Sequence, residues 1–202
     1  MDLLPLFDPS QNTLFGQWQQ TPQGLQVKAG DGGPFIITAP VDAGTDFDFE
    51  VDFSTTNPDI STFNQFFHIG NTLVEWTLNA HPTWALPYHG FPRLDGKDLT
   101  STPETYSREP IQFVTGQRYR SRIQVRQGQI SAWLDDRQLV HWQGEITRFQ
   151  RTAHFPIPRG HFALLSWTGG ATYHRVTLTH RSPEKLTPPA PKRLSAVPSL
   201  AA

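Results

Sequence analysis

A run of alternating acidic and apolar residues, 46–53, is the most chemically suggestive stretch of this 202-residue sequence. The acidic positions are Asp46, Asp48, Glu50 and Asp52, and the apolar ones are Phe47, Phe49, Val51 and Phe53. Four carboxylates can bind a metal ion or serve in acid–base chemistry. Alternate residues of a β-strand lie ~7 Å apart along it, however, so these acids do not converge. The pattern therefore predicts a strand with inward aromatics and an outward row of acids.

A row of like charges repels itself, so the acidic strand needs a neighbour that carries basic side chains. Two segments have this property. Segment 118–126 has arginines at 118, 120, 122 and 126, and segment 172–181 has arginines at 175 and 181. We expect a charge-complementary, solvated face where one of them pairs with 46–53.

His68 and Glu75 form a second candidate pair, on two consecutive predicted strands joined by a turn at Gly70 and Asn71. A hairpin at this turn brings His68 near Glu75. A histidine beside a carboxylate in a groove suits acid–base chemistry on a sugar. The alternative is a buried histidine whose hydrogen bonds are satisfied inside the fold.

The segment 79–110 is about 30 residues long, contains five prolines and has little strand pattern. Loops beyond ~12–15 residues in a compact domain are mostly functional or disordered. This one carries the ring side chains Trp84, Tyr88, His89 and Phe91, which is too aromatic for simple disorder. Two interpretations stay open: these rings contact a sugar or protein ligand, or they fold back to cover the edge of the domain.

Within this loop, Asp95 and Asp98 of the DGKD stretch can offer oxygen ligands to Ca²⁺, which takes six to eight. Asp-Gly is also a turn signal, and no further acids complete a calcium loop. We therefore expect no cofactor, with Ca²⁺ at Asp95 and Asp98 as the weaker alternative. The chain has no cysteine, no nucleophile elbow, no phosphate-binding loop and no zinc motif.

Short alternating segments separated by Gly, Pro, Asn and Asp recur along the chain, which predicts an all-β fold. The expected strands are 14–18, 24–28, 35–39, 47–54, 64–69, 73–79, 112–115, 118–127, 129–135, 138–142, 161–167 and 172–181. A short helical turn is expected at 145–149.

The hairpin around Gln127 and Gly128 has the most sharply defined register, because glycine supplies the positive φ of a two-residue turn. In this register Val125 faces Ile130, Ile123 faces Ala132 and Ser121 faces Leu134 on one side. On the other side Arg122 faces Trp133 and Arg120 faces Asp135. A second turn around Asp136 and Arg137 returns the chain along 138–142 and completes a three-stranded meander.

The composition excludes several classes of partner. The formal charge is −1, so nothing in the overall charge favours nucleic acid. No apolar run approaches the roughly 20 residues of a membrane span, and the start lacks the pattern of a signal peptide. We expect one domain over 1–181 and a flexible Pro-rich tail or linker over 182–202. Either the protein is cytoplasmic or the chain is a domain excised from a longer, multidomain protein.

The order of three motifs resembles the concanavalin A/laminin-G-like jelly-roll domains common in bacteria. The motifs are TDFDFEVDFS, GQRYRSRIQVRQGQISAWLDDRQLVHWQG and GHFALLSWTGGATYHRVTLT. Within these domains the chain is most similar to the group around the 3-keto-disaccharide hydrolases. The likeness covers residues 14–181 and implies a two-sheet antiparallel jelly-roll sandwich with one long irregular loop.

We interpret the chain as a non-catalytic recognition module of a larger bacterial protein, binding a carbohydrate or protein partner through the 79–110 loop. The resemblance implies an alternative, a glycan-active hydrolase or lyase. Its acid–base set would be His68, Glu75, Asp95 and Arg120. A third interpretation is a structural domain that assembles through its edge strands.

Overall fold

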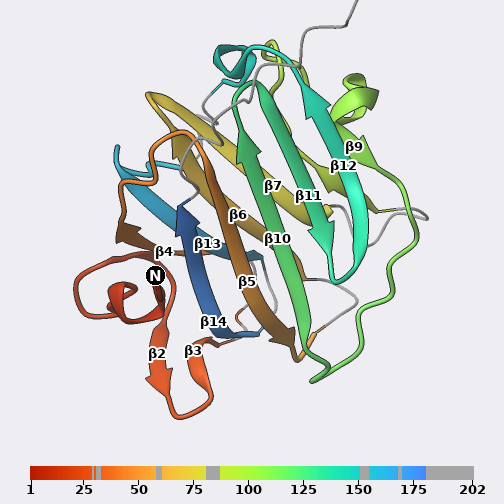
Figure 1. Cartoon of the computed structure of the whole chain (residues 1–202). Helices are drawn as coiled ribbons and strands as arrows, with labels where there is room; N and C mark the ends of the chain where they lie inside the picture. The colour runs from red at the N-terminus through yellow and green to blue at the C-terminus, as the bar shows by residue number, and fades with distance from the viewer. Residues whose placement is uncertain are drawn as a thin grey trace, which may run out of the picture.

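The computed structural model describes residues 1–28, 30, 33–57, 61–80, 87–150, 155–167 and 170–180. These residues form two antiparallel seven-stranded sheets that pack face to face (Figure 1). The predicted all-β, two-sheet sandwich is confirmed. The predicted tail, 182–202, lies outside the described residues.

We call the sheet that contains the acidic strand sheet A and the other sheet B. In spatial order, sheet A consists of β12 (Arg137–Gln143), β11 (Gln129–Leu134), β10 (Tyr119–Arg126), β5 (Phe47–Thr55), β14 (Ala171–His180), β3 (Gly24–Val27) and β2 (Trp18–Thr21). Sheet B consists of β1 (Thr13–Phe15), β4 (Pro34–Pro40), β13 (His161–Trp167), β6 (Thr62–Ile69), β7 (Thr72–Ala80), β8 (Tyr88–Gly90) and β9 (Tyr106–Ser107). Four 3₁₀ turns complete the described elements: η1 (Leu4–Leu6), η2 (Leu99–Ser101), η3 (Pro103–Thr105) and η4 (Ile146–Arg148). No helix in the described ranges is long and apolar enough to cross a membrane.

Strand β5 alternates as its sequence predicts. Phe47, Phe49, Val51 and Phe53 are each no more than 1% exposed. The Phe49 ring packs edge-on against Phe162 of sheet B at a centroid distance of 4.7 Å. The acids of β5 therefore point to the outer face of sheet A, away from sheet B.

Both predicted basic neighbours flank β5, β10 on one side and β14 on the other (Figure 1). Arg122 lies opposite Glu50, and Arg120 lies opposite Asp52. From β14, Arg175 also lies opposite Asp52, next to a β-bulge. The acidic row is thus held between two basic rows, which confirms the expected charge-complementary face.

The β10–β11–β12 meander has the predicted register, including Arg122 opposite Trp133 and Ile123 opposite Ala132. Gly128 has the expected positive φ of 68°. The second turn is one residue earlier than predicted. It consists of Asp135 and Asp136, with Leu134 paired to Arg137, and Asp135 adopts a φ of 52° that an aspartate tolerates better than most residues.

Three expected elements differ. Segment 112–115 is not a strand, and the 79–110 segment contains the short strands β8 and β9 with the turns η2 and η3. Strands of three and two residues are too short to show a period of two, so the sequence pattern missed them. The predicted strand 14–18 divides at Gly16, whose φ is 86°, into β1 and β2. The helical turn expected at 145–149 is present as η4.

Apolar side chains fill the space between the sheets and also cover the outer face of sheet B. The apolar cluster on the outer face of sheet B comprises Ile36, Phe66, Leu73, Phe155, Ile157, Ala163 and Leu165. Sheet B is therefore buried on both faces. The outer face of sheet A is polar, and it is where a solvated site can form.

Candidate functional site

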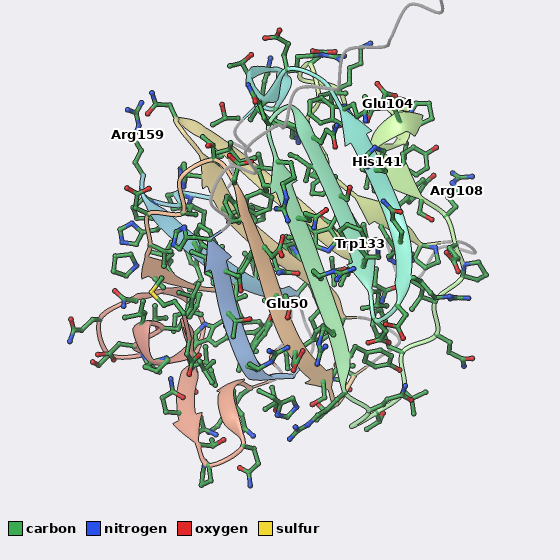
Figure 2. All side chains as sticks on the ribbon, in the orientation of Figure 1. Glu50, Glu104, Arg108, Trp133, His141 and Arg159 are labelled. Carbon is green, nitrogen blue, oxygen red and sulfur yellow. The ribbon has the colours of Figure 1, made fainter. Side chains whose placement is uncertain are left out.

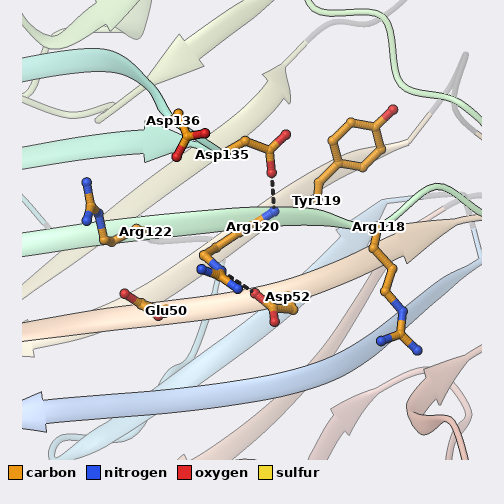
Figure 3. Close-up of a pocket in the computed structure, with 8 residues that line it drawn as sticks. All are labelled: Glu50, Asp52, Arg118, Tyr119, Arg120, Arg122, Asp135 and Asp136. Atoms are coloured by element: carbon orange, nitrogen blue, oxygen red, sulfur yellow. Dashed lines mark hydrogen bonds and ion pairs between the residues drawn. The ribbon is translucent and has the colours of Figure 1, made fainter.

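A groove of about 460 Å³ lies on the outer face of sheet A (Figure 3). Its lining combines the acids of β5, the arginines of β10 and the β11–β12 turn. The lining residues are Glu50, Asp52, Arg118, Tyr119, Arg120, Arg122, Asp135 and Asp136. Alternation explains Glu50, Asp52, Arg120 and Arg122, because β5 and β10 each present every second residue to the same face. Arg118 directly precedes β10, and Asp135 and Asp136 form the β11–β12 turn.

Asp52 on β5 forms ion pairs with arginines from both neighbouring strands. Arg120 Nε donates to Asp52 Oδ1 at 2.9 Å, and Arg175 Nε donates to Oδ2 at 2.8 Å. Arg175 Nη2 reaches on to Glu50 Oε2 at 3.2 Å. Two acids and two arginines from three strands therefore form one network.

The network shifts the pKa values of Asp52 and Arg175 in opposite directions. Partial burial acts to raise the pKa of Asp52, but hydrogen bonds from Arg175 and Arg120 outweigh it and hold that pKa below its usual value. The hydrogen bond to Asp52 in turn raises the pKa of Arg175. Both groups are charged at neutral pH, so the network presents fixed donors and acceptors.

Arg122 is held differently. Its guanidinium lies over the Trp133 ring, 4.3 Å from the centroid. Within the described part of the chain it makes no ion pair, and its buried Nε has no hydrogen-bond partner. Arg122 therefore has donor capacity that the described residues leave unused, next to a half-buried indole.

The polar face continues beyond the groove onto the edge strand. His141 on β12 bonds Ser131 Oγ through Nδ1 at 2.7 Å, and Gln143 Nε2 lies 3.1 Å from its Nε2. Figure 2 shows Glu50, Trp133 and His141 on this same side of the molecule. The face thus carries groups that can both donate and accept hydrogen bonds across four adjacent strands.

The structure places three of the four predicted ligand-binding side chains in the interior. Tyr88, His89 and Phe91 are 2%, 0% and 0% exposed. Phe91 packs on Trp76 at 4.8 Å between centroids. Of the two interpretations of segment 79–110, these residues favour the one in which the rings cover the domain. Trp84 lies outside the described residues.

His89 is fully hydrogen-bonded. Its Nδ1 accepts from the Asn79 N–H at 3.0 Å, and its Nε2 donates to the Glu109 carbonyl at 3.1 Å. Burial lowers the pKa of His89 from 6.5 to about 4. The side chain is neutral at pH 7 and its role in the described contacts is structural.

The structure does not bring together the four residues of the catalytic alternative. His68 and Glu75 lie on the outer face of sheet B, where His68 Nδ1 is 3.1 Å from the His161 carbonyl and Glu75 accepts from Asn64. Arg120 is on the outer face of sheet A. Asp95 is in the loop that pairs with 148–149. The two sheets thus separate the histidine from the arginine.

Both carboxylates of the DGKD turn are paired with arginines. Asp95 accepts two hydrogen bonds from Arg148, at 2.6 and 3.1 Å, and these bonds lower its pKa. Asp98 pairs with Arg93 at 3.2 Å. A Ca²⁺ ion at Asp95 would have to displace Arg148, and among the described residues no cluster of three or more His, Asp or Glu side chains is suited to a metal.

Of the predicted site residues that the structure describes, Arg120 alone lines the groove. The sequence pattern indicates Glu50 and Asp52 only as parts of a solvated face. It indicates Arg122 as part of an arginine face, 118–126, that could bind phosphate or a sulfated glycan but is partly neutralised by Asp135 and stacked on Trp133. The available signal was the expected pairing of the acidic strand with the arginine strand, together with Arg122 opposite Trp133. Its weakness is that alternating charges occur on the exposed face of many sheets.

Comparisons with known proteins identify the fold. No family model matches the sequence, and no curated protein matches it. The chain is similar to the carbohydrate-binding module CBM66 from Bacillus subtilis, with 18% identity and a TM-score of 0.55 over 82% of this chain and 92% of that one. It is also similar to a protein of unknown function with a galectin-like fold from Bacillus subtilis (11% identity, TM-score 0.61, 88% and 94% covered). A third match is the exoplasmic/lumenal domain of VIP36 in its Ca²⁺/Man3GlcNAc-bound form (12% identity, TM-score 0.58, 84% of each chain covered).

The similar structures also include a putative glycosyl hydrolase from Parabacteroides distasonis and an alginate lyase. At these identities the likeness shows the fold alone. It confirms the concanavalin A-like jelly-roll sandwich that the sequence motifs implied.

Proposed function

We propose that this protein is a carbohydrate-recognition module and that the groove on the outer face of sheet A holds the sugar. The observation that carries the proposal is the composition of the groove. It is an open hollow of about 460 Å³, and seven of its eight lining residues have ionic side chains. Ligand pockets for small molecules have volumes of roughly 300–1,000 Å³, so a short saccharide has room.

The chemistry of the lining suits hydroxyl groups. A hydroxyl both donates and accepts hydrogen bonds, whereas a carboxylate only accepts and a guanidinium only donates. Glu50 and Arg122 lie directly opposite each other on adjacent strands, so they offer an acceptor and a donor side by side. Trp133 next to Arg122 adds an aromatic ring that can pack against the apolar face of a sugar.

The comparisons support the same class of function, since the similar structures include a carbohydrate-binding module and a mannose-bound domain. The geometry gives less support to the hydrolase alternative, because its four proposed residues lie on different faces. Incubating the chain with 3-keto-glycosides and divalent metals tests that alternative directly, and product release would establish it.

Binding variants test the proposal. Glu50→Gln keeps the shape of the side chain and removes its charge, so we expect affinity for the bound glycan to fall about tenfold or more, since hydrogen bonds to charged groups contribute about 1.5–3 kcal/mol. The matched control is Glu104→Gln, an exposed glutamate on η3 that lies away from the groove (Figure 2). Binding is measured by glycan array and then by calorimetry on the glycans that score.

A second pair of variants tests whether the guanidinium of Arg122 contributes to binding. Arg122→Met should weaken binding comparably, whereas Arg159→Met, at an exposed turn, should leave it unchanged. Trp84→Ala, in the segment outside the described residues, tests the predicted loop contact separately. Equal affinities of the wild type, Glu50→Gln and Arg122→Met, all folded, would place the site elsewhere.

A further inference from the structure

We propose that the groove selects uncharged saccharides and excludes anionic ones such as sulfated glycans and polyuronates. This inference rests on the proposed function and adds the class of ligand. The rows of arginine on β10 invite the opposite conclusion, that the face binds sulfate or carboxylate. The charges of the groove argue against it.

The groove is electrically balanced. Four carboxylates line it, against the guanidinium groups of Arg118, Arg120 and Arg122. Arg175, which bonds Asp52 and Glu50, adds a fourth guanidinium next to these three. An approaching anion therefore meets no net positive charge, and the whole chain adds none, since its formal charge is −1.

The guanidinium groups that could attract an anion are mostly engaged. Arg120 and Arg175 are bonded to Asp52 from opposite sides. Farther along β10, Arg126 donates to Asp48 at 2.7 Å and to the Phe47 carbonyl at 3.1 Å. At Arg120, Arg175 or Arg126 a sulfate or carboxylate group would have to replace a paired carboxylate and leave it unpaired, which is costly for a partly buried charge. At Arg122, which has no such partner, it would meet the carboxylate of Glu50 directly opposite on the next strand.

A neutral sugar makes no such demand. Its hydroxyls can donate to free carboxylate lone pairs and accept from Arg118 or Arg122 without breaking an ion pair. Asp135 and Asp136, at the groove rim, offer further acceptors and repel anions (Figure 3). The ion-pair network thus holds the groove side chains in place and also disfavours the binding of anions.

Affinity electrophoresis of the full chain tests the ligand class. The gels contain a neutral polysaccharide (dextran, mannan or galactan) or an anionic one (heparin, polygalacturonate or alginate). We expect retardation by one or more neutral polymers, with an affinity that changes less than about twofold between 50 and 500 mM NaCl, because no charge pairing contributes. Binding to anionic polymers alone would overturn the inference and leave the proposed function standing. Binding to none, on gels or on the glycan array, would remove both.

Charge-altering variants test the exclusion of anions directly. Asp52→Asn removes one negative charge while keeping a hydrogen-bond acceptor, so we expect salt-sensitive retardation by heparin that the wild type does not show. Asp136→Asn should act in the same direction. Because Asp136 is exposed, this variant still tests the inference if Asp52→Asn fails to fold. The control Asp98→Asn removes the same charge from the Arg93 pair elsewhere and should gain nothing. If both groove variants are folded and heparin retards neither of them, charge balance does not determine the ligand class.

Discussion

His89 has a buried imidazole with both ring nitrogens hydrogen-bonded, and its pKa is lowered to about 4. A histidine with a depressed folded-state pKa leaves stability intact above its unfolded value of 6.5. As the pH falls below 6.5, His89 becomes protonated in the unfolded chain but stays neutral in the folded chain. Stability is therefore lost between about pH 6.5 and pH 4. The loss from this one group is at most on the order of 3 kcal/mol.

We therefore predict that the free energy of unfolding, measured by urea titration, decreases from pH 7 to pH 4.5. His89→Gln should be less stable at pH 7 but show a flatter dependence on pH. Parallel pH curves for the wild type and the variant would contradict the assignment. An NMR titration of the His89 ring provides an independent check, with a midpoint expected well below the ordinary value of 6.5.

At the scale of elements, β5 is the strand on which sandwich and groove both depend. Its odd residues fill the core and its even residues build the ion-pair network, so one strand serves two faces. Phe49→Ala should reduce the free energy of unfolding by about 3–5 kcal/mol, the usual cost of removing a buried phenylalanine. Asp46→Ala, at the partly exposed start of the same run, should change it by less than about 0.5 kcal/mol. Similar losses for the two variants in urea denaturation would contradict the alternation.

At the scale of the whole molecule, the two outer faces have different roles. The outer face of sheet B is closed by an apolar cluster that includes Ile157, which is 0% exposed. The outer face of sheet A carries the groove. Ile157→Ala should therefore destabilise the fold by about 2–4 kcal/mol and leave glycan affinity at the groove unchanged, because the sandwich lies between them. A change in affinity without loss of stability would show that the groove is not the binding face.

The sequence by itself determined which side chains of each long strand face inward. Alternation is a local property of extended backbone, so the residues 46–53 and the hairpin around Gly128 could be placed from their own pattern. The expected partners of the acidic strand followed from charge, and both of them flank β5.

Only the tertiary structure decided that Arg175, 123 residues from Asp52, completes the network with Arg120. It also decided that Tyr88, His89 and Phe91 are covered and that His68 and Arg120 lie on opposite faces. Such facts depend on which distant strands pair and what packs over them. The period of two carries no information about either, because the same alternation is compatible with several strand orders.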